Sequence, residues 1–208
     1  MSVNTVIVLA TGNKGKLSEL RSYFTGLPIE FKSQKDLSVS EVEETGTTFI
    51  ENAIIKARHA AKETGLPALA DDSGLMVDAL NGLPGVYSAR YAGMNATDEQ
   101  RIEKLLIALS GLDRQASFCC ALAFLRNADD PAPIVAWGRW EGFILEKPIG
   151  DHGFGYDPIF WVPTHNCSAA ELEIEEKNKM SHRGRAIKQL FNQINPIFSK
   201  NRGTVVDR

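Results

Sequence analysis

A buried strand that leads directly into a glycine loop and then into a helix most constrains the fold of this chain. Residues 5–10 form a continuous apolar and β-branched run, which is typical of a strand covered on both faces. Apolar residues then recur at helical spacing between Leu17 and Phe24, and the helix is expected to end near Gly26. Between the two lie Thr11, Gly12, Asn13, Lys14, Gly15 and Lys16. The chain therefore begins with a strand–loop–helix unit of an α/β protein.

Three further helices are predicted from their start and stop signals. The spacings T-x-x-E at Thr48–Glu51 and T-x-x-Q at Thr97–Gln100 are those of capping boxes, in which side chains satisfy the free N–H groups at a helix start. Ser181 is a good N-cap for the last helix, which Pro196 is expected to end. Helices therefore alternate with the extended segments of the chain.

The extended segments predict a mixed sheet. A short buried strand at 67–70 is expected to stop at the acidic turn 71–74. Two long extended runs, 117–125 and 134–145, flank a turn-prone segment and predict an antiparallel pair, and a further strand is expected at 159–162. We therefore expect an α/β fold with a mixed sheet flanked by helices, parallel near the N-terminus and antiparallel in the middle.

Composition narrows the classes of function. The 208 residues include 43% hydrophobic residues and carry a net charge of −3, which is typical of a globular protein and argues against binding to long nucleic acids. Because no linker or repeat is visible, we expect a single domain over 1–208. The three cysteines lack C-x-x-C spacing and no apolar run reaches membrane-spanning length, so neither a targeting signal nor a membrane span is expected. A cytoplasmic protein without membrane or nucleic-acid partners is expected.

The glycine loop has the properties of an anion site. Glycines allow close approach of the backbone, the first N–H groups of a helix lack internal partners, and the helix dipole adds positive potential. Lys14 and Lys16 add full charges, but the spacing matches neither a Walker A loop nor G-x-G-x-x-G. From the spacing alone, a phosphate site and an ordinary turn with surface lysines remain equal alternatives.

Two acidic clusters lie at the ends of predicted elements. Glu41, Glu43 and Glu44 precede the helix at 48, and Asp71 and Asp72 close the strand before it turns. One acid from each cluster would suit Mg²⁺, which prefers one or two carboxylates together with water and phosphate oxygens. For the glutamates, the alternative of a solvated acidic turn is favoured by this evidence alone. Neighbouring residues on a strand point to opposite faces, so only one of the two aspartates is expected to face a site.

Two segments near the C-terminus suit a nucleotide base or an anion. The loop Gly153-Phe154-Gly155-Tyr156-Asp157-Pro158 offers rings for stacking, although a bulged turn with both rings in the core is the favoured alternative. The start of the last helix, Ser181-His182-Arg183-Gly184, with Lys177 before it, has cations that oppose the helix dipole. A bound anion would relieve this conflict, and an ordinary surface helix start is equally compatible.

Taken together, these motifs identify a family. T-G-N-x-G-K, E-E-T-G-x-T-F-x-E-N-A, D-D-S-G-L, G-x-P-G-V-Y-S-A-R-Y, G-F-G-Y-D-P-I-F and S-H-R-G-x-A occur in this order between Val6 and Phe191. The chain closely resembles the inosine/xanthosine triphosphate pyrophosphatases, which hydrolyse deaminated purine nucleoside triphosphates to the monophosphate and pyrophosphate. The resemblance implies an elongated mixed sheet with a nucleotide cleft between two lobes, a Mg²⁺ cofactor and a homodimer.

The resemblance also implies roles for particular residues. Glu44 and Asp72 would hold Mg²⁺, and Asp72 would also be the general base, a role that Asp71 or Glu44 could take instead. The residues implied to bind substrate are Thr11, Gly12, Asn13, Lys14, Gly15, Lys16, Lys56, Ser73, Phe154, Gly155, Tyr156, Asp157, Lys177, His182 and Arg183. Of these, the glycine loop and Lys56 would bind phosphate, and the residues from 154 onward would form the nucleotide pocket, with Phe154 stacking on the base. Arg183, a pure hydrogen-bond donor, would accept a 6-oxo purine and oppose the 6-amino group of adenine.

Overall fold

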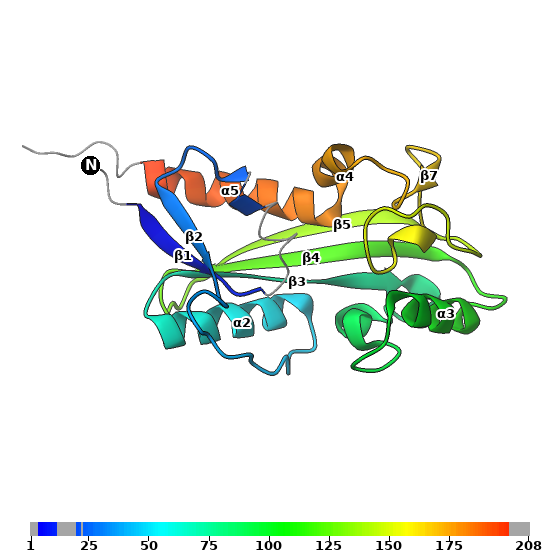
Figure 1. Ribbon diagram of the computed structural model, residues 1–208, viewed down its shortest axis with the longest axis horizontal. Helices are drawn as coiled ribbons and strands as arrows, with labels where there is room; N and C mark the ends of the chain where they lie inside the picture. The colour runs from blue at the N-terminus through cyan, green and yellow to red at the C-terminus, as the bar shows by residue number, and fades with distance from the viewer. Residues whose placement is uncertain (1–3, 12–19, 22, 200–208) are drawn as a thin grey trace, which may run out of the picture. The chain divides into compact units, whose positions relative to one another are not determined.

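The structure contains one seven-stranded sheet with helices packed on it. It is a computed structural model that describes residues 4–11, 20, 21 and 23–199. The strands follow the order β2-β1-β3-β4-β5-β6-β7 (Figure 1). They are β1 (Thr5–Leu9), β2 (Ile29–Ser33), β3 (Ala68–Val77), β4 (Gln115–Leu125), β5 (Ile134–Ile144), β6 (Phe160–Val162) and β7 (Cys167–Ser168). The helices are α2 (Phe49–Thr64), α3 (Asp98–Ala108), α4 (Ile174–Met180) and α5 (His182–Ser199), with 3-10 turns η1 (Asp78–Leu80), η2 (Gly85–Arg90) and η3 (Asp157–Ile159).

The chain divides into two compact units. The first unit comprises the described residues of Met1–Asp72, Ala121–Trp137 and Ala186–Arg208, and the second comprises Ser73–Cys120 and Gly138–Arg185. The boundary falls within β3, β4 and β5, so each of these long strands contributes residues to both units. The expectation of a single domain over 1–208 stays a prediction.

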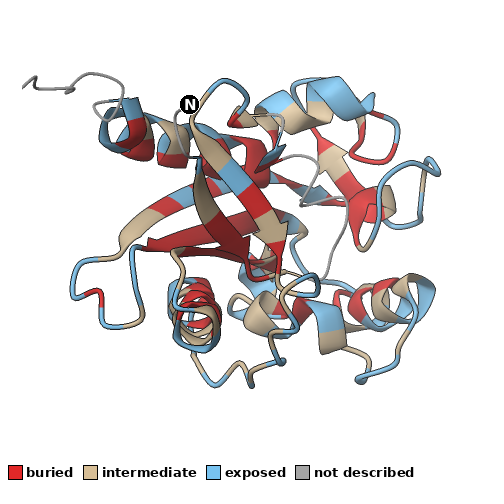
Figure 2. Ribbon diagram, turned by 60° about the vertical axis from the view of Figure 1, so that its left-hand side comes forward, coloured by how far each residue is buried: buried red, intermediate tan, exposed pale blue. Residues whose placement is uncertain are grey.

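The first unit contains the parallel part of the sheet. β1 pairs in parallel with β2 on one side and with β3 on the other. Figure 1 shows α2 and α5 on opposite faces of the strands of this unit, and the strand residues between them are buried (Figure 2). Ile7, Val8 and Leu9 are fully buried, as expected for a strand covered on both faces.

The second unit contains the antiparallel pairs β5–β6 and β6–β7. β4 and β5 are neighbours, and their connection at 126–133 is shorter than the dozen or more residues that a parallel crossover needs. The predicted antiparallel pairing of these two strands follows from this connection. The core of the unit contains Leu75, Leu105, Phe118 and Phe160, with the Phe118 and Phe160 ring centroids 4.6 Å apart.

The three helix starts predicted at Thr48, Thr97 and Ser181 are confirmed, but one predicted helix end is wrong; the start of the helix predicted from Leu17 to Phe24 lies outside the described residues. Thr48 and Thr97 each complete a capping box, and the Gly184 N–H donates to Ser181 Oγ at the start of α5. Pro196 does not end α5, which continues to Ser199. Phe198 packs against Phe124 in this last turn, and this buried contact offsets the backbone hydrogen bond that a proline removes.

The predicted end of the third strand is also wrong. β3 continues through residues 71–74 to Val77, whereas the sequence predicts a turn there. Leu75 and Val77 are fully buried, and this tertiary burial outweighs the local turn preference of Asp-Asp-Ser-Gly. β2, which has the alternating sequence Ile-Glu-Phe-Lys-Ser, was not predicted, although alternation of this kind is the signal of a half-buried strand.

No helix among the described residues has both the length and the apolarity to cross a bilayer.

An ion pair closes the β4–β5 turn and makes stability depend on pH. The buried Asp130 accepts hydrogen bonds from Arg126 Nε (2.8 Å) and Arg126 N (2.9 Å). The hydrogen bonds from the Arg126 side chain hold the pKa of Asp130 well below its usual range, so the stabilisation is present at neutral pH and is lost as pH falls below about 4. We expect Asp130→Asn to lower Tm by a few degrees at pH 7 and by less at pH 3. Calorimetry at both pH values checks this, and an equal Tm difference at both would contradict it.

Candidate active site

Three charged side chains meet in the first unit. Lys56, on α2, donates through Nζ to Glu44 Oε1 at 2.7 Å and to Asp72 Oδ1 at 3.1 Å. Asp72 lies on β3 and is 8% exposed, whereas Glu41 and Glu43 of the same acidic cluster as Glu44 are exposed. The structure therefore brings together one acid from each predicted cluster, with a lysine between them.

The amide of Asn52 contacts the same aspartate. Asn52 is fully buried on α2, and its Nδ2 donates to Asp72 Oδ2 at 3.2 Å. The contacts from Lys56 and Asn52 use two of the roughly four acceptor positions of a carboxylate, which leaves capacity for a water or a metal ion. Sequence reasoning missed Asn52, and the signal available was a polar residue between Phe49 and Ala53 on the apolar face of the helix.

Burial and charge shift the pKa values in this cluster. Burial raises the pKa of Asp72, and the nearby Glu44 adds to this effect, while Lys56 opposes it without cancelling it. Burial alone would lower the pKa of Lys56, but the charges of Asp72 and Asp71 and the contact with Glu44 outweigh it, so that this pKa is raised. Lys56 is therefore a firmly charged ammonium group at neutral pH, and Asp72 is a stronger base than an exposed aspartate.

Asp71 and Asp72 lie in the middle of β3 and follow the residues of β3 that pair with the carboxyl end of β1. β1 has β2 on one side and β3 on the other, so the gap between β1 and β3 is a topological switch point, where such folds bind ligands at the carboxyl ends of the strands. Leu9, the last residue of β1, is paired with Leu69, and the Ala10 N–H donates to the Leu69 backbone oxygen at 2.8 Å. The glycine loop thus begins two residues after this pair, and Asp71 and Asp72 follow the same pair in β3. The remaining residues of the loop, Gly12, Asn13, Lys14, Gly15 and Lys16, lie outside the described residues.

The second unit contains the predicted nucleotide pocket residues. Asp157 is buried and accepts hydrogen bonds from the Phe154 backbone N–H at 2.9 Å and from Lys177 Nζ. The Phe154 ring is 55% exposed, and Lys177 Nζ lies 5.4 Å from its centroid. A Cβ on Gly153 would come within 2.3 Å of Asp157 Oδ2, so glycine is required for this loop to close on the aspartate. The loop presents an exposed ring beside a cation.

His182 and Arg183 start α5 as buried residues of the same unit. The His182 ring stacks on Phe118, with centroids 4.9 Å apart. Arg183 Nη2 donates to Ser73 Oγ at 3.3 Å, and its Cζ lies 5.9 Å from the centroid of Phe154. The alternative of an ordinary surface helix start is therefore wrong, because both side chains are buried. The arginine, the serine and the exposed phenylalanine form one group, as the sequence motifs predict.

The two rings of the loop at 153–158 have different environments. Tyr156 is 4% exposed and its hydroxyl donates to the backbone oxygen of Ser88 at 3.0 Å. The apolar ring of Tyr156 and its satisfied hydroxyl are therefore part of the core, and the role of Tyr156 as a substrate contact stays a prediction. The alternative in which both rings are buried is wrong for Phe154. Only the more exposed ring is available for stacking.

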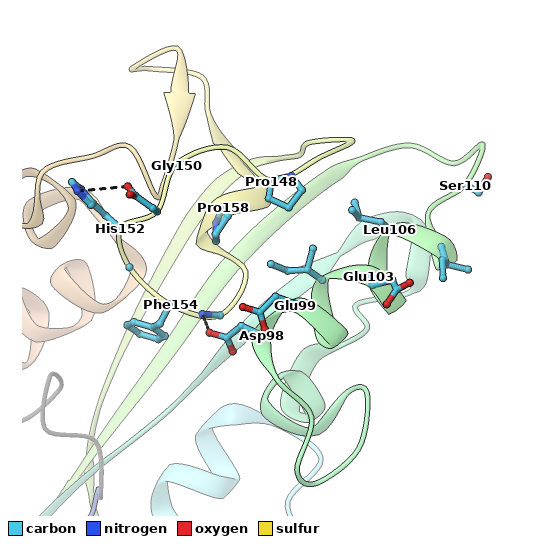
Figure 3. Close-up of a pocket in the computed structure, with 15 residues that line it drawn as sticks. Asp98, Glu99, Glu103, Leu106, Ser110, Pro148, Gly150, His152, Phe154 and Pro158 are labelled. Carbon is cyan, nitrogen blue, oxygen red and sulfur yellow. Dashed lines mark hydrogen bonds and ion pairs between the residues drawn. The ribbon is translucent and has the colours of Figure 1, made fainter.

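The loop at 153–158 also borders a pocket of about 920 Å³ in the second unit (Figure 3). Phe154 and Gly155 border it, and the Gly155 N–H donates to Asp98 Oδ2 at 2.6 Å. The other lining residues include Glu99, Glu103 and Asp151, while Lys177, His182 and Arg183 are absent from its lining. An acidic wall repels a triphosphate, so we do not assign the phosphate chain to this pocket.

The cluster around Lys56 fits a magnesium ion. Among the described residues, no group of three or more His, Cys, Asp or Glu side chains is arranged to hold a metal, whereas Mg²⁺ needs only one or two carboxylates because water and phosphate oxygens complete its octahedron. The ammonium group of Lys56 binds both Glu44 and Asp72, so these carboxylates lie close enough together to share a cation. Their hard oxygen donors suit Mg²⁺ and are a poor match for metals that prefer sulfur or nitrogen ligands.

The fold and the two groups of residues define an α/β protein with two carboxylates joined by a lysine in the first unit and an exposed phenylalanine beside two cations in the second. The sequence model of the Ham1 family matches residues 7–193. The chain belongs to the Ham1 family.

Similar proteins agree with this assignment. A dITP/XTP pyrophosphatase of Idiomarina loihiensis is 58% identical over 201 residues, which cover 93% of this chain and 99% of that protein. A dITP/XTP pyrophosphatase of Coxiella burnetii is 56% identical over 195 residues, or 92% of this chain and 98% of that protein. The family resemblance read from the motifs is confirmed.

Solved structures support the fold. The structure of a HAM1 protein from Coxiella burnetii is 56% identical in sequence and superposes with a TM-score of 0.90, covering 92% of this chain and 99% of that one. The Staphylococcus aureus Ham1 protein is 42% identical, with a TM-score of 0.85 over 93% of this chain and all of that one. The predicted mixed α/β fold is therefore confirmed.

Proposed function

We propose that this protein is a pyrophosphatase for deaminated purine nucleoside triphosphates. It hydrolyses dITP, ITP, XTP and dXTP to the nucleoside monophosphate and pyrophosphate, which removes these nucleotides before they enter DNA or RNA. The observation that carries the proposal is the ion cluster of Glu44, Lys56 and Asp72, in a chain 58% identical to a dITP/XTP pyrophosphatase.

The reaction is an attack of water on the α-phosphorus. Asp72 takes a proton from the water, the new bond forms between the water oxygen and the α-phosphorus, and the bond to the oxygen that bridges to the β-phosphorus breaks. Burial of Asp72 raises its pKa, which improves it as a base at neutral pH. Glu44 and Asp72 would hold Mg²⁺, which when bound neutralises part of the triphosphate charge and makes the attacking water more acidic.

Positive groups stabilise the departing pyrophosphate. Lys56 is already charged and is held beside the two carboxylates, and Lys14 and Lys16, which lie outside the described residues, are expected to add two further positive charges. Backbone N–H groups of the loop, from Thr11 to Lys16, are expected to bind phosphate oxygens. Charge that moves onto the leaving group in the transition state would then meet fixed cations and dipoles.

The residues of the second unit recognise the base. The exposed Phe154 ring stacks on the purine, and Arg183, held by Ser73, donates to the 6-oxo oxygen. Adenine presents a 6-amino donor at this position, so its binding would leave two donors opposed. Gly155, Asp157, Lys177 and His182 shape this side of the pocket. Guanine also has a 6-oxo group, so rejection of GTP requires a contact at the 2-position.

A panel of substrates tests the proposed function. We expect Mg²⁺-dependent release of pyrophosphate from dITP and XTP, with little from ATP or GTP. Turnover of pyrimidine or modified nucleotides in preference to dITP would replace the substrate class. Tight binding of dITP without any release would indicate a nucleotide-binding regulator, and release of orthophosphate would indicate cleavage of another bond.

Arg183→Met is expected to weaken recognition of the 6-oxo group. The side chain keeps its bulk and loses its donors, so kcat/KM for dITP should fall roughly 10- to 100-fold while kcat/KM for dATP is unchanged or rises. The ratio of the two constants is the measurement. Lys188→Met, at an exposed position of α5, is the matched control. An unchanged ratio in Arg183→Met would remove the base-reading role from Arg183.

The cofactor, the cellular location and the oligomeric state are proposed from the family resemblance. We propose Mg²⁺ as the cofactor, a cytoplasmic location, a homodimer, and no nucleic-acid or membrane partner. Leu83, Tyr87 and Met94 are exposed apolar side chains of the second unit, and this composition is compatible with an interface. Sedimentation velocity tests the dimer.

A further inference from the structure

A single buried amide connects one carboxylate of the proposed metal site, Asp72, with the backbone that follows the other, Glu44. Asn52 is 0% exposed and lies in the first turns of α2. Its Oδ1 accepts a hydrogen bond from the Gly46 N–H at 2.8 Å, and its Nδ2 donates to Asp72 Oδ2 at 3.2 Å. The orientation of the amide is determined by its partners, since the Gly46 N–H requires an oxygen and the carboxylate requires a donor. Asn52 thus bonds to Asp72 and to the backbone two residues after Glu44.

The approach of Gly46 to Asn52 leaves no space for a side chain. A Cβ on Gly46 would lie 2.7 Å from Asn52 Oδ1 and 2.6 Å from the Cβ of Glu51. These distances are shorter than any normal contact, so the segment that carries Glu44 packs against α2 at this point because residue 46 is glycine. The Glu51 side chain accepts hydrogen bonds from the Thr47 and Thr48 N–H groups and holds the same segment on its other side.

We propose that Asn52 is a positioning residue that sets the separation of Glu44 and Asp72 and thereby the affinity of this pair for a divalent cation. The inference rests on the proposed function for the identity of the site. Asn52 contacts neither the phosphate chain nor the reacting water in this account. Asn52 acts through Asp72 and through the segment that carries Glu44. Residues that hydrogen-bond to metal ligands generally orient those ligands, and their loss typically costs 10- to 100-fold in metal affinity or activity.

The alternative is that Asn52 serves stability alone. A buried asparagine with both ends hydrogen-bonded would stabilise any fold, and its removal would lower Tm without any specific effect on a metal. Metal affinity, measured below the melting temperature, therefore separates the two roles. Mn²⁺ is a suitable probe, because its binding is followed by electron paramagnetic resonance without turnover.

The test compares two variants that disturb the connection in different ways. Asn52→Leu has a similar volume and removes both hydrogen bonds, whereas Gly46→Ala keeps the Asn52 amide and forces the Glu44 segment and α2 apart at their contact. Mn²⁺ binding is measured alone and with α,β-methylene dITP, whose P–C bond is not hydrolysed. We expect the Kd for Mn²⁺ to rise about 10- to 100-fold in both variants, and kcat for dITP to fall more than KM changes.

Gly65→Ala is the matched control. Gly65 ends the same helix with φ +68°, and nothing lies within 4 Å of a Cβ there, so the substitution strains the backbone without touching the site. It should lower Tm and leave Mn²⁺ affinity unchanged. Native Mn²⁺ affinity in folded Gly46→Ala or Asn52→Leu would overturn the proposal. An equal loss of Mn²⁺ affinity in Gly65→Ala would overturn it as well, and so would a native protein that binds no Mn²⁺ with or without the nucleotide analogue. If the native protein binds Mn²⁺ but releases no pyrophosphate from dITP, the proposed function fails separately.

Discussion

Asp72→Asn is expected to lower the rate of pyrophosphate release from dITP by about 10²- to 10⁴-fold, the usual contribution of a general base. The amide has the shape of the carboxylate but cannot accept a proton from water at neutral pH. Its single oxygen can satisfy Lys56 or Asn52 but not both, since both present donors to Asp72 in the native protein. We therefore expect a folded, slightly destabilised variant whose kcat is lost.

Two other substitutions make this result specific. Asp130→Asn removes a buried carboxylate of the same unit that interacts with Arg126, and it should retain native kcat. Asp71→Asn changes the neighbouring buried acid and should reduce kcat much less than Asp72→Asn. A larger loss in Asp71→Asn would transfer the role of general base to Asp71, and full activity in Asp72→Asn would remove that role from Asp72.

Lys56→Met is expected to destabilise the protein by about 3 kcal/mol in the absence of divalent metal, because loss of one partner leaves buried charges uncompensated. The Lys56 side chain is only 18% exposed, and its ammonium group interacts with both Glu44 and Asp72. Without it, the two carboxylates repel one another in a partly desolvated site. Urea unfolding of the variant and the native protein in EDTA measures the difference.

Magnesium should partly restore the stability of Lys56→Met. If Glu44 and Asp72 form a cation site, Mg²⁺ replaces part of the missing charge, so MgCl₂ should raise Tm more in the variant than in the native protein. Lys62→Met is the matched control, because Lys62 is exposed on the same helix and should change neither stability nor the response to MgCl₂ by much. Equal stability of the two variants in EDTA would show that Lys56 does not compensate the carboxylates.

Elements with strong local signals could be predicted from the sequence, whereas strand limits could not. The capping boxes at Thr48 and Thr97 involve neighbouring residues only, so their sequence spacing is sufficient. The course of β3 through Asp71 and Asp72 depends on Lys56 and Asn52, which approach from another element and provide partners for buried acids. Burial of this kind is a tertiary effect, and local turn preference cannot report it.

Some features of the candidate site could be predicted from the sequence, and others depend on tertiary contacts. The family resemblance implied one nucleotide pocket for Phe154, Lys177 and Arg183; the structure brings these side chains together, and their roles stay a prediction. The different environments of Phe154 and Tyr156 could not be predicted, because two aromatic residues two positions apart in a glycine-rich loop are equivalent by composition. Asn52 was missed because helical periodicity marks its face as apolar, and only the contacts with Gly46 and Asp72 explain a polar residue there.

The bond that water attacks is the central claim, and isotope transfer tests it most directly. The native protein is incubated with dITP and Mg²⁺ in H₂¹⁸O, and the products are analysed by mass spectrometry. Attack at the α-phosphorus predicts one ¹⁸O atom in each dIMP and none in pyrophosphate from the first turnover. Label in pyrophosphate with unlabelled dIMP would mean attack at the β-phosphorus and would contradict the role assigned to the Asp72 site.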